Sequence, residues 1–586
     1  MRLICPRAAV LFLFLSIVAF GSAATAARAQ SPTLEWVQRA NSSGAVDDRL
    51  FEMRVGPDGG VTVTGYSNGQ TVAYLTTLHY DANGGEQWAT AIPLAIPYIG
   101  NPIFTEAAMA MDENGDAYVT GAVPDGDGAW FWPLMLTAKI DQAGAIKWLH
   151  VIPPEGAYTA GYGAAIAVAP DGGVVVGGGM DYNIKLPFFF TLVKYDSGGA
   201  LAWDKMYAPL LNGENAETPG AMAIDASGEI WLVGGAYQGN DQYARFCTLK
   251  ANADGAKNWI EYLPTFGSTD DYALDVAVDQ QQNAYVVGSV NGAYTLAKYT
   301  ADGGLVYEKN EAAGEAAAVV LTPQGKVAVT GTSALNVGDT CTTIVYSPAG
   351  AIVWQANERG PNQEFCAAKA VAVDAAGNVY VAGSLNTSRA SSDIYVIKYS
   401  VAGDLVWTAR YHGGAAGENT SRRIAVDGLS VYVGGTSAGG GTGLDFVTLK
   451  YSQECDGCLI DLVCYADGQP NPQNSCERCD LGQSGSEWTV AADGAACDDG
   501  LFCNGADQCA NGQCAAHAGD PCVPPATCSE EQDTCVAADD DVLDDDATDD
   551  DVSADDDATD DDASVDDDAA GDDSSSGGGD NSSCGC

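Results

Sequence analysis

The segment TLVKYDSGGALAW (Thr191–Trp203) contains the pattern that decides the fold. Its first half alternates apolar and polar residues, as a half-buried β-strand does, and a turn that contains glycine follows. An aromatic residue stands four positions after the last glycine of that turn, within a second alternating stretch. The segment therefore predicts two antiparallel strands joined by a tight turn.

The same segment recurs along the chain between residues 34 and 452. After the last Lys-Tyr pair, Lys450-Tyr451, the aromatic residue is missing, and a matching residue stands near the start of the mature chain in LEWVQRA (Leu34–Ala40). We expect this early segment to supply the missing strand. The aromatic residues of the set are Trp36, Trp88, Trp148, Trp203, Trp259, Tyr307, Trp354 and Trp407.

A second signature precedes each copy of the first, as in DENGDAYVTG (Asp112–Gly121) and DAAGNVYVAG (Asp374–Gly383). A strand rich in Ala and Val leads through a short turn into this signature, so each repeat is predicted to contain four strands. Two short turns fall on one face of such a unit, and the longer connections fall on the other. The closing glycines are Gly65, Gly121, Gly178, Gly234, Gly288, Gly331, Gly383 and Gly434, at intervals of 43 to 57 residues.

Radial packing of four-stranded units buries their faces. The sequence therefore predicts an all-β fold over residues 30–452, an eight-bladed β-propeller whose last blade is completed by the N-terminal strand around Trp36. Over residues 34–452 the repeats resemble bacterial β-propeller repeat proteins of the SBBP type. That resemblance implies the repeat architecture and an extracytoplasmic setting, and it implies no single activity.

Residues 1–29 have the features of a secretory signal peptide. Arg2 and Arg7 precede the apolar run Ala8–Phe20, and Ala27-Arg28-Ala29 provides small residues around a cleavage site. No later segment is long and apolar enough to predict a transmembrane helix. We expect a secreted or cell-surface bacterial protein, in which disulfides are the default state of cysteine.

The composition argues against several classes of function. With 26 Lys and Arg against 79 Asp and Glu, the net charge of −53 disfavours nucleic acids and anionic membranes as partners. Only four histidines are present (79, 150, 412 and 517), which disfavours chemistry that depends on imidazole. We predict a non-catalytic binding or display protein for an extracellular protein or polysaccharide. A propeller hydrolase of glycans, esters or lactones is the alternative, and a structural envelope component is a second one.

Residues 453–538 are predicted to form a disulfide-rich module with little apolar core. Cys455-x-x-Cys458 and Cys476-x-x-Cys479 also have zinc-ribbon spacing, so a zinc site is the alternative for these four. Within the repeats, Cys341 and Cys366 are predicted to form a disulfide, and Cys247 a buried thiol. The cysteines of the module are Cys455, Cys458, Cys464, Cys476, Cys479, Cys497, Cys503, Cys509, Cys514, Cys522, Cys528 and Cys535.

The stretch CDDGLFCNGADQCANGQC (Cys497–Cys514) resembles cysteine-rich repeats in surface proteins of myxobacteria-like bacteria. Residues 539–586 consist of Asp triplets, small residues and a Ser/Gly-rich end, which predicts a disordered acidic tail that acts as a spacer. The terminal Cys584-Gly585-Cys586 resembles the region before the sorting helix of myxobacterial C-terminal anchors. Attachment through Cys584 or Cys586 is therefore a hypothesis, and a flexible end is its alternative.

Function is expected on the face with the long connections. Trp130 and Trp132 are candidates for stacking on a sugar or anchoring a protein, or for capping a neighbouring blade. Carboxylates before the inner strands are candidates for an acidic ring that holds a cation or a basic partner, or for turn caps. No cofactor is predicted, and weak calcium binding by the tail or the channel mouth is left open. These carboxylates are Asp48, Glu106, Glu217, Asp271, Glu315, Glu364 and Glu418.

Lysines also recur at equivalent positions of the third strand in most repeats. We expect these side chains to be solvated and to flank the strands, rather than to form a site. They are Lys139, Lys194, Lys250, Lys298, Lys398 and Lys450.

Overall fold

The computed structural model describes most of the repeat region and of the cysteine-rich region. The described residues are 31–41, 47–69, 72–94, 107–124, 133–152, 160–181, 189–207, 217–236, 243–263, 269–335, 338–386, 391–455, 457–461, 463–524, 526–529 and 534–536. The predicted signal peptide and the predicted acidic tail, with Cys584 and Cys586, lie outside them.

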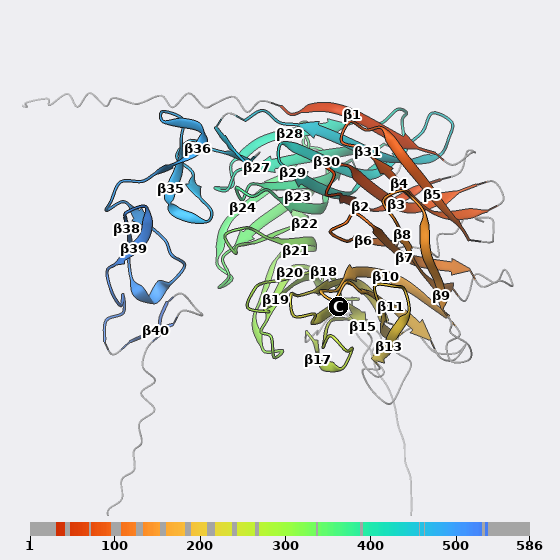
Figure 1. Cartoon of the computed structure of the whole chain (residues 1–586), viewed down its shortest axis with the longest axis horizontal. Helices are drawn as coiled ribbons and strands as arrows, with labels where there is room; N and C mark the ends of the chain where they lie inside the picture. Colours follow the sequence, from red (N-terminus) through yellow and green to blue (C-terminus); the bar gives the residue numbers. More distant parts are fainter. Residues whose placement is uncertain are drawn as a thin grey trace, which may run out of the picture.

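The repeat region, which we call the head, is built from antiparallel sheets that lie around a common centre (Figure 1). Among the residues that the structure describes, six of these sheets have four strands and one has seven. In the part of the chain that the structure describes, the only helical element is the 3₁₀ turn η1 (Phe502–Asn504), which lies outside the head. None of the described helical structure has the length and apolar character needed to cross a bilayer.

The first strand of each repeat, which we call the inner strand, contacts the inner strand of the next repeat. These contacts run from β2 through the repeats to β29, and β29 contacts β2 again. The first and last repeats are therefore neighbours. The inner strands are β2 (Arg49–Val55), β6 (Ala108–Met111), β10 (Ala160–Val168), β14 (Glu217–Ile224), β18 (Tyr272–Val278), the second part of β21 (Leu305–Leu321), β25 (Cys366–Val373) and β29 (Asn419–Asp427).

The second strands carry the YVTG-like signature and are buried almost throughout, because each lies between two other strands and under a neighbouring sheet. They are β3 (Val61–Asn68), β7 (Ala117–Pro124), β11 (Val174–Asp181), β15 (Ile230–Ala236), β19 (Ala284–Val290), β22 (Val327–Leu335), β26 (Val379–Leu385) and β30 (Ser430–Ala438).

The third and fourth strands form the hairpin predicted from the Lys-Tyr and aromatic signature. The third strands are β4 (Ala73–Tyr80), β8 (Pro133–Ile140), β12 (Phe189–Tyr195), β16 (Arg245–Ala251), β20 (Ala293–Tyr299), β23 (Gly338–Tyr346), β27 (Asp393–Tyr399) and β31 (Leu444–Ser452). The fourth strands are β5 (Glu86–Pro93), β9 (Ile146–Ile152), β13 (Leu201–Tyr207), β17 (Lys257–Tyr262), the first part of β21, β24 (Ile352–Glu358), β28 (Leu405–Tyr411) and β1 (Thr33–Ala40).

Two details of the strand pairing differ from the sequence-based expectation. β21 is one continuous strand that pairs with β20 over its first part and with β22 over its second, so the fifth and sixth repeats share the seven-stranded sheet. The closing glycines are only 43 residues apart there, and the short connection leaves no room for a loop. In the last repeat, the residue that matches Gly383 in register is Gly435, rather than Gly434.

The N-terminal strand β1 pairs antiparallel with β31 and supplies the fourth strand of the last repeat's sheet. Trp36 on β1 packs against Gly84 in the turn of the first repeat, where an added Cβ would lie 2.9 Å from the ring. Trp148 packs in the same way against Gly199 of the following repeat. Trp36 therefore occupies the place of the aromatic residue that the last repeat lacks.

The recurrent lysines are mostly buried, which corrects the expectation that they are solvated. Lys250 is 2% exposed, and its ammonium lies 4.6 Å from the centre of the Trp231 ring and 2.6 Å from Glu229. Lys139, Lys298, Lys398 and Lys450 likewise lie over a tyrosine ring of the neighbouring second strand. Cation–π contact and ion pairing offset the loss of water around each ammonium, so these lysines belong to the packing between strands.

Residues 453–536, the cysteine-rich module, form small two- and three-stranded sheets beside the head (Figure 1). The module rests on the seventh repeat, where the Gln469 side-chain amide donates to the Ala376 carbonyl at 2.8 Å and Tyr465 packs near Ala376. Its strands are β32 (Cys458–Ile460), β33 (Val463–Tyr465), β34 (Pro470–Asn471), β35 (Asn474–Asp480), β36 (Ser484–Val490), β37 (Ala496–Cys497), β38 (Asp507–Ala510), β39 (Gln513–His517), β40 (Thr527–Ser529) and β41 (Thr534–Val536).

The described residues contain seven disulfides, and together these indicate that the chain folds in an oxidising compartment such as the cell exterior. The predicted pair in the head, Cys341–Cys366, is confirmed, and Cys247 is a buried thiol outside the disulfides. The twelve cysteines of the module form six further disulfides, as their even number indicated. The pairs are 455–464, 458–479, 476–509, 497–514, 503–528 and 522–535.

Candidate ligand-binding site

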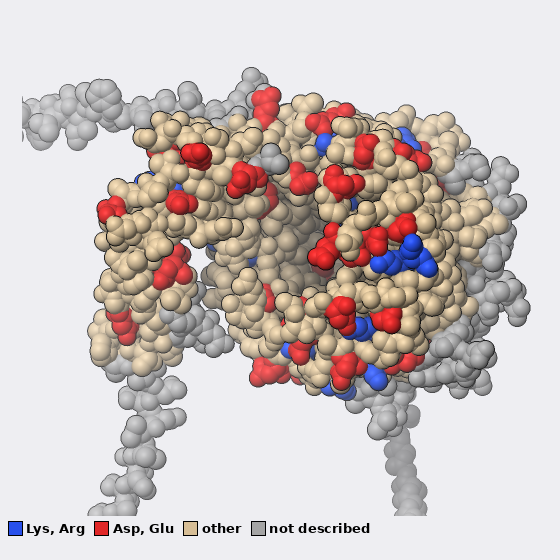
Figure 2. All heavy atoms as spheres, in the orientation of Figure 1, with Lys and Arg blue, Asp and Glu red and all other residues tan. Residues whose placement is uncertain are grey.

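A hollow lies at the centre of the head, and acidic side chains are frequent on the face around it (Figure 2). Two of the predicted carboxylates, Asp48 and Asp271, are buried, with 1% and 0% exposed. Asp48 accepts a hydrogen bond from the Asn68 backbone amide at 2.7 Å, and Asp271 accepts one from the Asn291 amide at 2.6 Å. Both carboxylates thus cap the backbone between an inner strand and the strand beside it, as the turn-cap interpretation expects.

Three other predicted carboxylates lie in contact with basic side chains. Burial raises the pKa of Glu364, but hydrogen bonds from Asn386 and Arg410 outweigh this effect and hold the pKa below its usual value. Glu418 lies 3.6 Å from Arg49. Glu315 lies 3.5 Å from Lys369, and both side chains are nearly half exposed.

The remaining candidates are not placed. Glu106, Trp130 and Trp132 lie outside the described residues, so stacking by the two tryptophans stays a prediction. Glu217 is the first residue of β14 and pairs in register with Ala236, and its side chain is not described. The structure therefore brings no set of predicted carboxylates together into a ring within the described residues.

A cavity of about 230 Å³ lies at the ends of β25, β26 and β29, where the long connections of the seventh and eighth repeats begin and end. This end of the strands belongs to the face on which the sequence analysis expects function. Side chains with hydroxyl groups and charges surround the cavity. They are Lys369, Ser384, Ser392, Glu418, Thr420, Ser421 and Arg422.

Ser421 has an unusual environment in this cavity. Ser421 is buried, with 1% of its surface exposed, and its Oγ makes no hydrogen bond with any residue that the structure describes. The other two serine hydroxyl groups have partners: Ser392 Oγ accepts from the Asn419 amide at 2.9 Å, and Ser384 Oγ accepts from the Ser421 amide at 3.3 Å. A buried hydroxyl without a partner costs free energy, which a bound ligand would recover by hydrogen bonding to it.

A charged cluster lies next to the cavity, on β2 and β29. Glu52 is 4% exposed, and its Oε1 accepts hydrogen bonds from Arg54 Nη1 at 2.6 Å and Arg423 Nε at 2.8 Å. Burial raises the pKa of Glu52, but the two guanidinium groups outweigh burial and hold that pKa below its usual value. Arg54 and Arg423 remain 45% and 41% exposed, so both guanidinium groups are accessible to solvent.

This cluster was absent from the charged site candidates of the sequence, because those are acidic residues before the inner strands, whereas Glu52, Arg54 and Arg423 lie within them. A comparison of the inner strands with one another would have found it, since most of them carry Ala where β2 and β29 carry charge. Asp275 on β18 would have been found in the same way. Its carboxylate accepts hydrogen bonds from the Val276 and Val319 amides, both at 2.9 Å, and so joins the inner strands of the fifth and sixth repeats.

The histidines of the head have packing or ion-pair partners. His79 stands where other repeats have lysine, stacks on Trp88 and lies 3.0 Å from Asp58. His150 stacks on Tyr195, with the ring centres 4.9 Å apart. His412 lies 2.9 Å from Asp393, whose carboxylate also binds Arg410. These contacts give each imidazole a structural partner and do not by themselves define a catalytic group.

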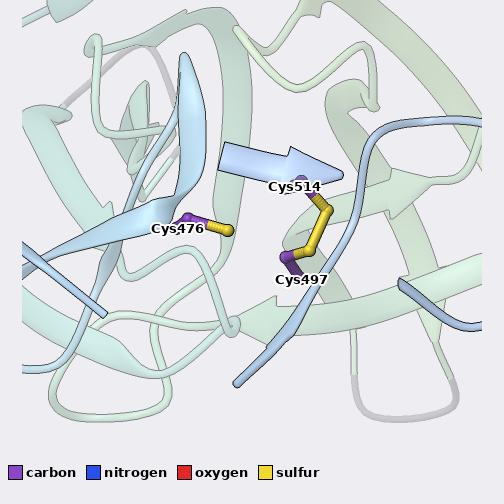
Figure 3. A group of neighbouring side chains, drawn as sticks. All are labelled: Cys476, Cys497 and Cys514. Atoms are coloured by element: carbon purple, nitrogen blue, oxygen red, sulfur yellow. A yellow bond between two sulfur atoms is a disulfide. The ribbon is translucent and has the colours of Figure 1, made fainter. Parts of the chain in front are cut away.

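The zinc alternative for the module is replaced by disulfides. Cys476, Cys497 and Cys514 have sulfur atoms close together, and Figure 3 shows the bond that joins the last two. Cys476 is bonded to Cys509, and the other cysteines with zinc-ribbon spacing are also in disulfides. Sulfur atoms in disulfides are not the thiolates that zinc requires.

Comparison with known proteins leaves the family open. No family model matches the sequence, and no curated protein matches it. The polysaccharide lyase Uly1 is similar in structure over 71% of this chain and 91% of its own, with 10% identity and a TM-score of 0.37. A protein from Lactobacillus plantarum aligns over 54% and 92%, with 13% identity and a TM-score of 0.36. A eukaryotic initiation factor aligns over 63% and 97%, with 7% identity and a TM-score of 0.33. At these scores the likenesses carry no argument about function.

Proposed function

We propose that this chain is an exported, non-catalytic display protein whose head is a closed eight-bladed β-propeller that binds an extracellular polysaccharide or protein. Support for the closed ring comes from the contact between β29 and β2 and from the pairing of β1 with β31. The cysteine-rich module is then a neck, and the acidic tail is a spacer between the head and its point of attachment.

The observation that carries the binding function is the buried, unpartnered Ser421 hydroxyl in a polar cavity on the long-connection face. Water or a ligand hydroxyl group at this point would satisfy Ser421, and Lys369 and Arg422 provide charge beside it. The cavity is small, so it suits one sugar ring or one side chain of a larger ligand rather than a whole molecule.

A hydrolase is the alternative, and a carboxylate pair would be its most economical machinery. Within the described residues, Glu364 binds Arg410 and Asn386, and Glu418 lies near Arg49, so these carboxylates already have structural partners. The binding function therefore accounts for the site with fewer assumptions.

The experiment is a glycan array combined with a hydrolysis screen, both with the full mature chain. Specific binding without turnover is the expected result. Turnover that a single carboxylate substitution abolishes would contradict the proposal and favour the hydrolase. A Ser421→Ala variant provides the link to the cavity, because it should weaken binding while the fold, in which this hydroxyl makes no hydrogen bond, stays intact.

A further inference from the structure

The inner strands share a register that allows direct comparison of their residues. In most inner strands a β-bulge interrupts the pairing with the second strand of the same repeat. The residue that follows the bulge pairs with the residue directly before the closing glycine of the second strand. Five repeats carry Ala at this register position, and the other three carry charge. The eight residues are Glu52, Ala108, Ala165, Ala221, Asp275, Ala318, Ala370 and Arg423.

Neighbouring positions show the same contrast. Two residues further along, Arg54 replaces the alanine or valine that stands in each of the other repeats. One residue earlier, at the bulge, Lys369 and Arg422 stand in the seventh and eighth repeats. Four basic residues thus gather on the inner strands of the seventh, eighth and first repeats. We call Arg54, Lys369, Arg422 and Arg423 the inner cationic cluster.

The strand itself does not require these basic residues, because most of the other repeats form the same strand with uncharged residues at these positions. The Glu52–Arg423 contact joins the first repeat to the eighth and has a structural use. Lys369 likewise contacts Glu315 of the sixth repeat at 3.5 Å, but both side chains are nearly half exposed, and Arg54 is 45% exposed, so both basic side chains remain accessible to a ligand. In a chain of net charge −53, a group of accessible basic residues, two of which line the cavity, is a local exception that favours an acidic ligand.

Glu52 positions two of the four basic side chains. A single oxygen of Glu52 contacts both Arg54 and Arg423, and the two side chains remain 45% and 41% exposed. Arg422 lies over the Phe51 ring at 5.2 Å and lines the cavity, and Arg423 Nη1 donates to the Arg422 carbonyl. The cluster and the hydroxyl-lined cavity are therefore parts of one surface.

We infer that the ligand of this surface is an acidic polysaccharide, whose carboxylate or sulfate groups contact the inner cationic cluster while ring hydroxyl groups occupy the cavity beside Ser421. This inference rests on the proposed binding function and specifies its ligand class. Guanidinium groups match carboxylates and sulfates with paired hydrogen bonds, and serine and threonine hydroxyl groups match sugar hydroxyl groups. An acidic protein segment would use the cations and leave the hydroxyl-lined cavity unexplained.

The test measures binding of the full mature chain to immobilised polygalacturonate, dextran sulfate and neutral dextran. We expect binding to one of the acidic polymers at least about tenfold tighter than to dextran, with a decline at higher salt. The two acidic arms separate carboxylate recognition from sulfate recognition. General attraction to polyanions is not expected of so acidic a chain, so binding to them reports a local site.

Lys369→Ala and Lys147→Ala form a matched pair. Both lysines are about half exposed, at 47% and 56%, and each lies near one carboxylate, at 3.5 Å and 3.3 Å. Only Lys369 lies in the cluster, so only its substitution should weaken binding, by about threefold to tenfold for a charge-assisted hydrogen bond. Equal effects of the two substitutions would overturn the inference.

The outcomes separate this inference from the proposed function. Binding to neutral dextran as tight as to the acidic polymers would overturn the acidic ligand and retain a carbohydrate-binding head. Loss of acidic-polymer binding in Ser421→Ala and Lys369→Ala, with an unchanged melting temperature, would support both. Absence of binding to all three polymers would overturn the inference and remove polysaccharide binding from the proposed function.

Discussion

The head and the cysteine-rich module are both β-structures, but different forces hold them together. The head buries whole strands between neighbouring sheets, and its largest fully buried side chains are Trp231 and a series of tyrosines and phenylalanines. The module has six disulfides and only small groups of buried residues, several of which are the cysteines themselves. Packing therefore defines the head, and covalent bonds define the module.

Reduction of the disulfides should produce the largest difference in stability between the two regions. Dithiothreitol breaks the six disulfides of the module, which has too little apolar core to fold without them, whereas the head loses only Cys341–Cys366. Limited proteolysis with mass spectrometry should show cleavage throughout residues 453–536 and a protected fragment that contains β2 to β31. Equally fast cleavage of the head would show that disulfides hold it as well.

Glu52→Ala should destabilise the head by about 3 kcal/mol, because it removes a buried carboxylate that accepts hydrogen bonds from both Arg54 and Arg423. Denaturant unfolding followed by tryptophan fluorescence measures the change. Glu315→Ala is the control: its ion pair with Lys369 is half exposed, so the loss should stay below about 1 kcal/mol. Equal losses would mean that burial does not strengthen the Glu52 contacts.

Alanine substitutions at two glycines, one in each region, allow a direct comparison of the packing. Gly199 in the head and Gly494 in the module both have positive φ, at 89° and 84°. A Cβ on Gly199 would lie 2.5 Å from Trp148, whereas nothing lies within 4 Å of one on Gly494. Both alanine variants incur backbone strain of about 1 kcal/mol, and Gly199→Ala should incur about 1–3 kcal/mol more. Thermal unfolding of each variant measures the difference, and equal costs would contradict close packing around the head's turns.

The smallest expected effect concerns pH. Burial raises the pKa of Asp275 to about 6, while backbone hydrogen bonds and Arg423 oppose the shift and Glu52 adds to it. In the unfolded chain the pKa of the Asp275 carboxyl is about 4. Between about pH 4 and pH 6 the native state therefore binds more protons than the unfolded state. The stability that protonation contributes is present below pH 4 and is lost as pH rises through 6. Asp275→Asn should remove the contribution of this carboxyl to the change of the free energy of unfolding with pH. Denaturant unfolding at a series of pH values between about 4 and 7 measures that change.

The sequence predicted much of the head because its signals are local and repeated. Alternation in segments such as Thr191–Trp203 predicts strands, and the turn glycines fix where each hairpin ends. The burial of Lys250 was missed because its partners, Trp231 and Glu229, come from another strand and a turn. The six disulfide pairs of the module were not predictable individually, since they join cysteines up to 33 residues apart with no repeat to guide the pairing.

Candidate site residues were harder to predict than the strands. Acidic residues before the inner strands are visible in the sequence, but only the fold shows that Asp48 and Asp271 cap backbone amides. The unpartnered Ser421 hydroxyl depends on how β25, β26 and β29 meet, which no local pattern encodes. Charge at positions that are alanine in other repeats is the one signal of this surface present in the sequence.

Hydrogen exchange of the backbone amides in β1, measured by mass spectrometry on the full mature chain, tests the proposed ring most directly. If the head closes by pairing Thr33–Ala40 with Leu444–Ser452, peptides that cover β1 should be protected to nearly the same extent as peptides from β28, which is the outer strand at the equivalent position of the seventh repeat. Exchange of β1 at the rate of an unstructured peptide, with β30 still protected, would contradict closure by the N-terminal strand.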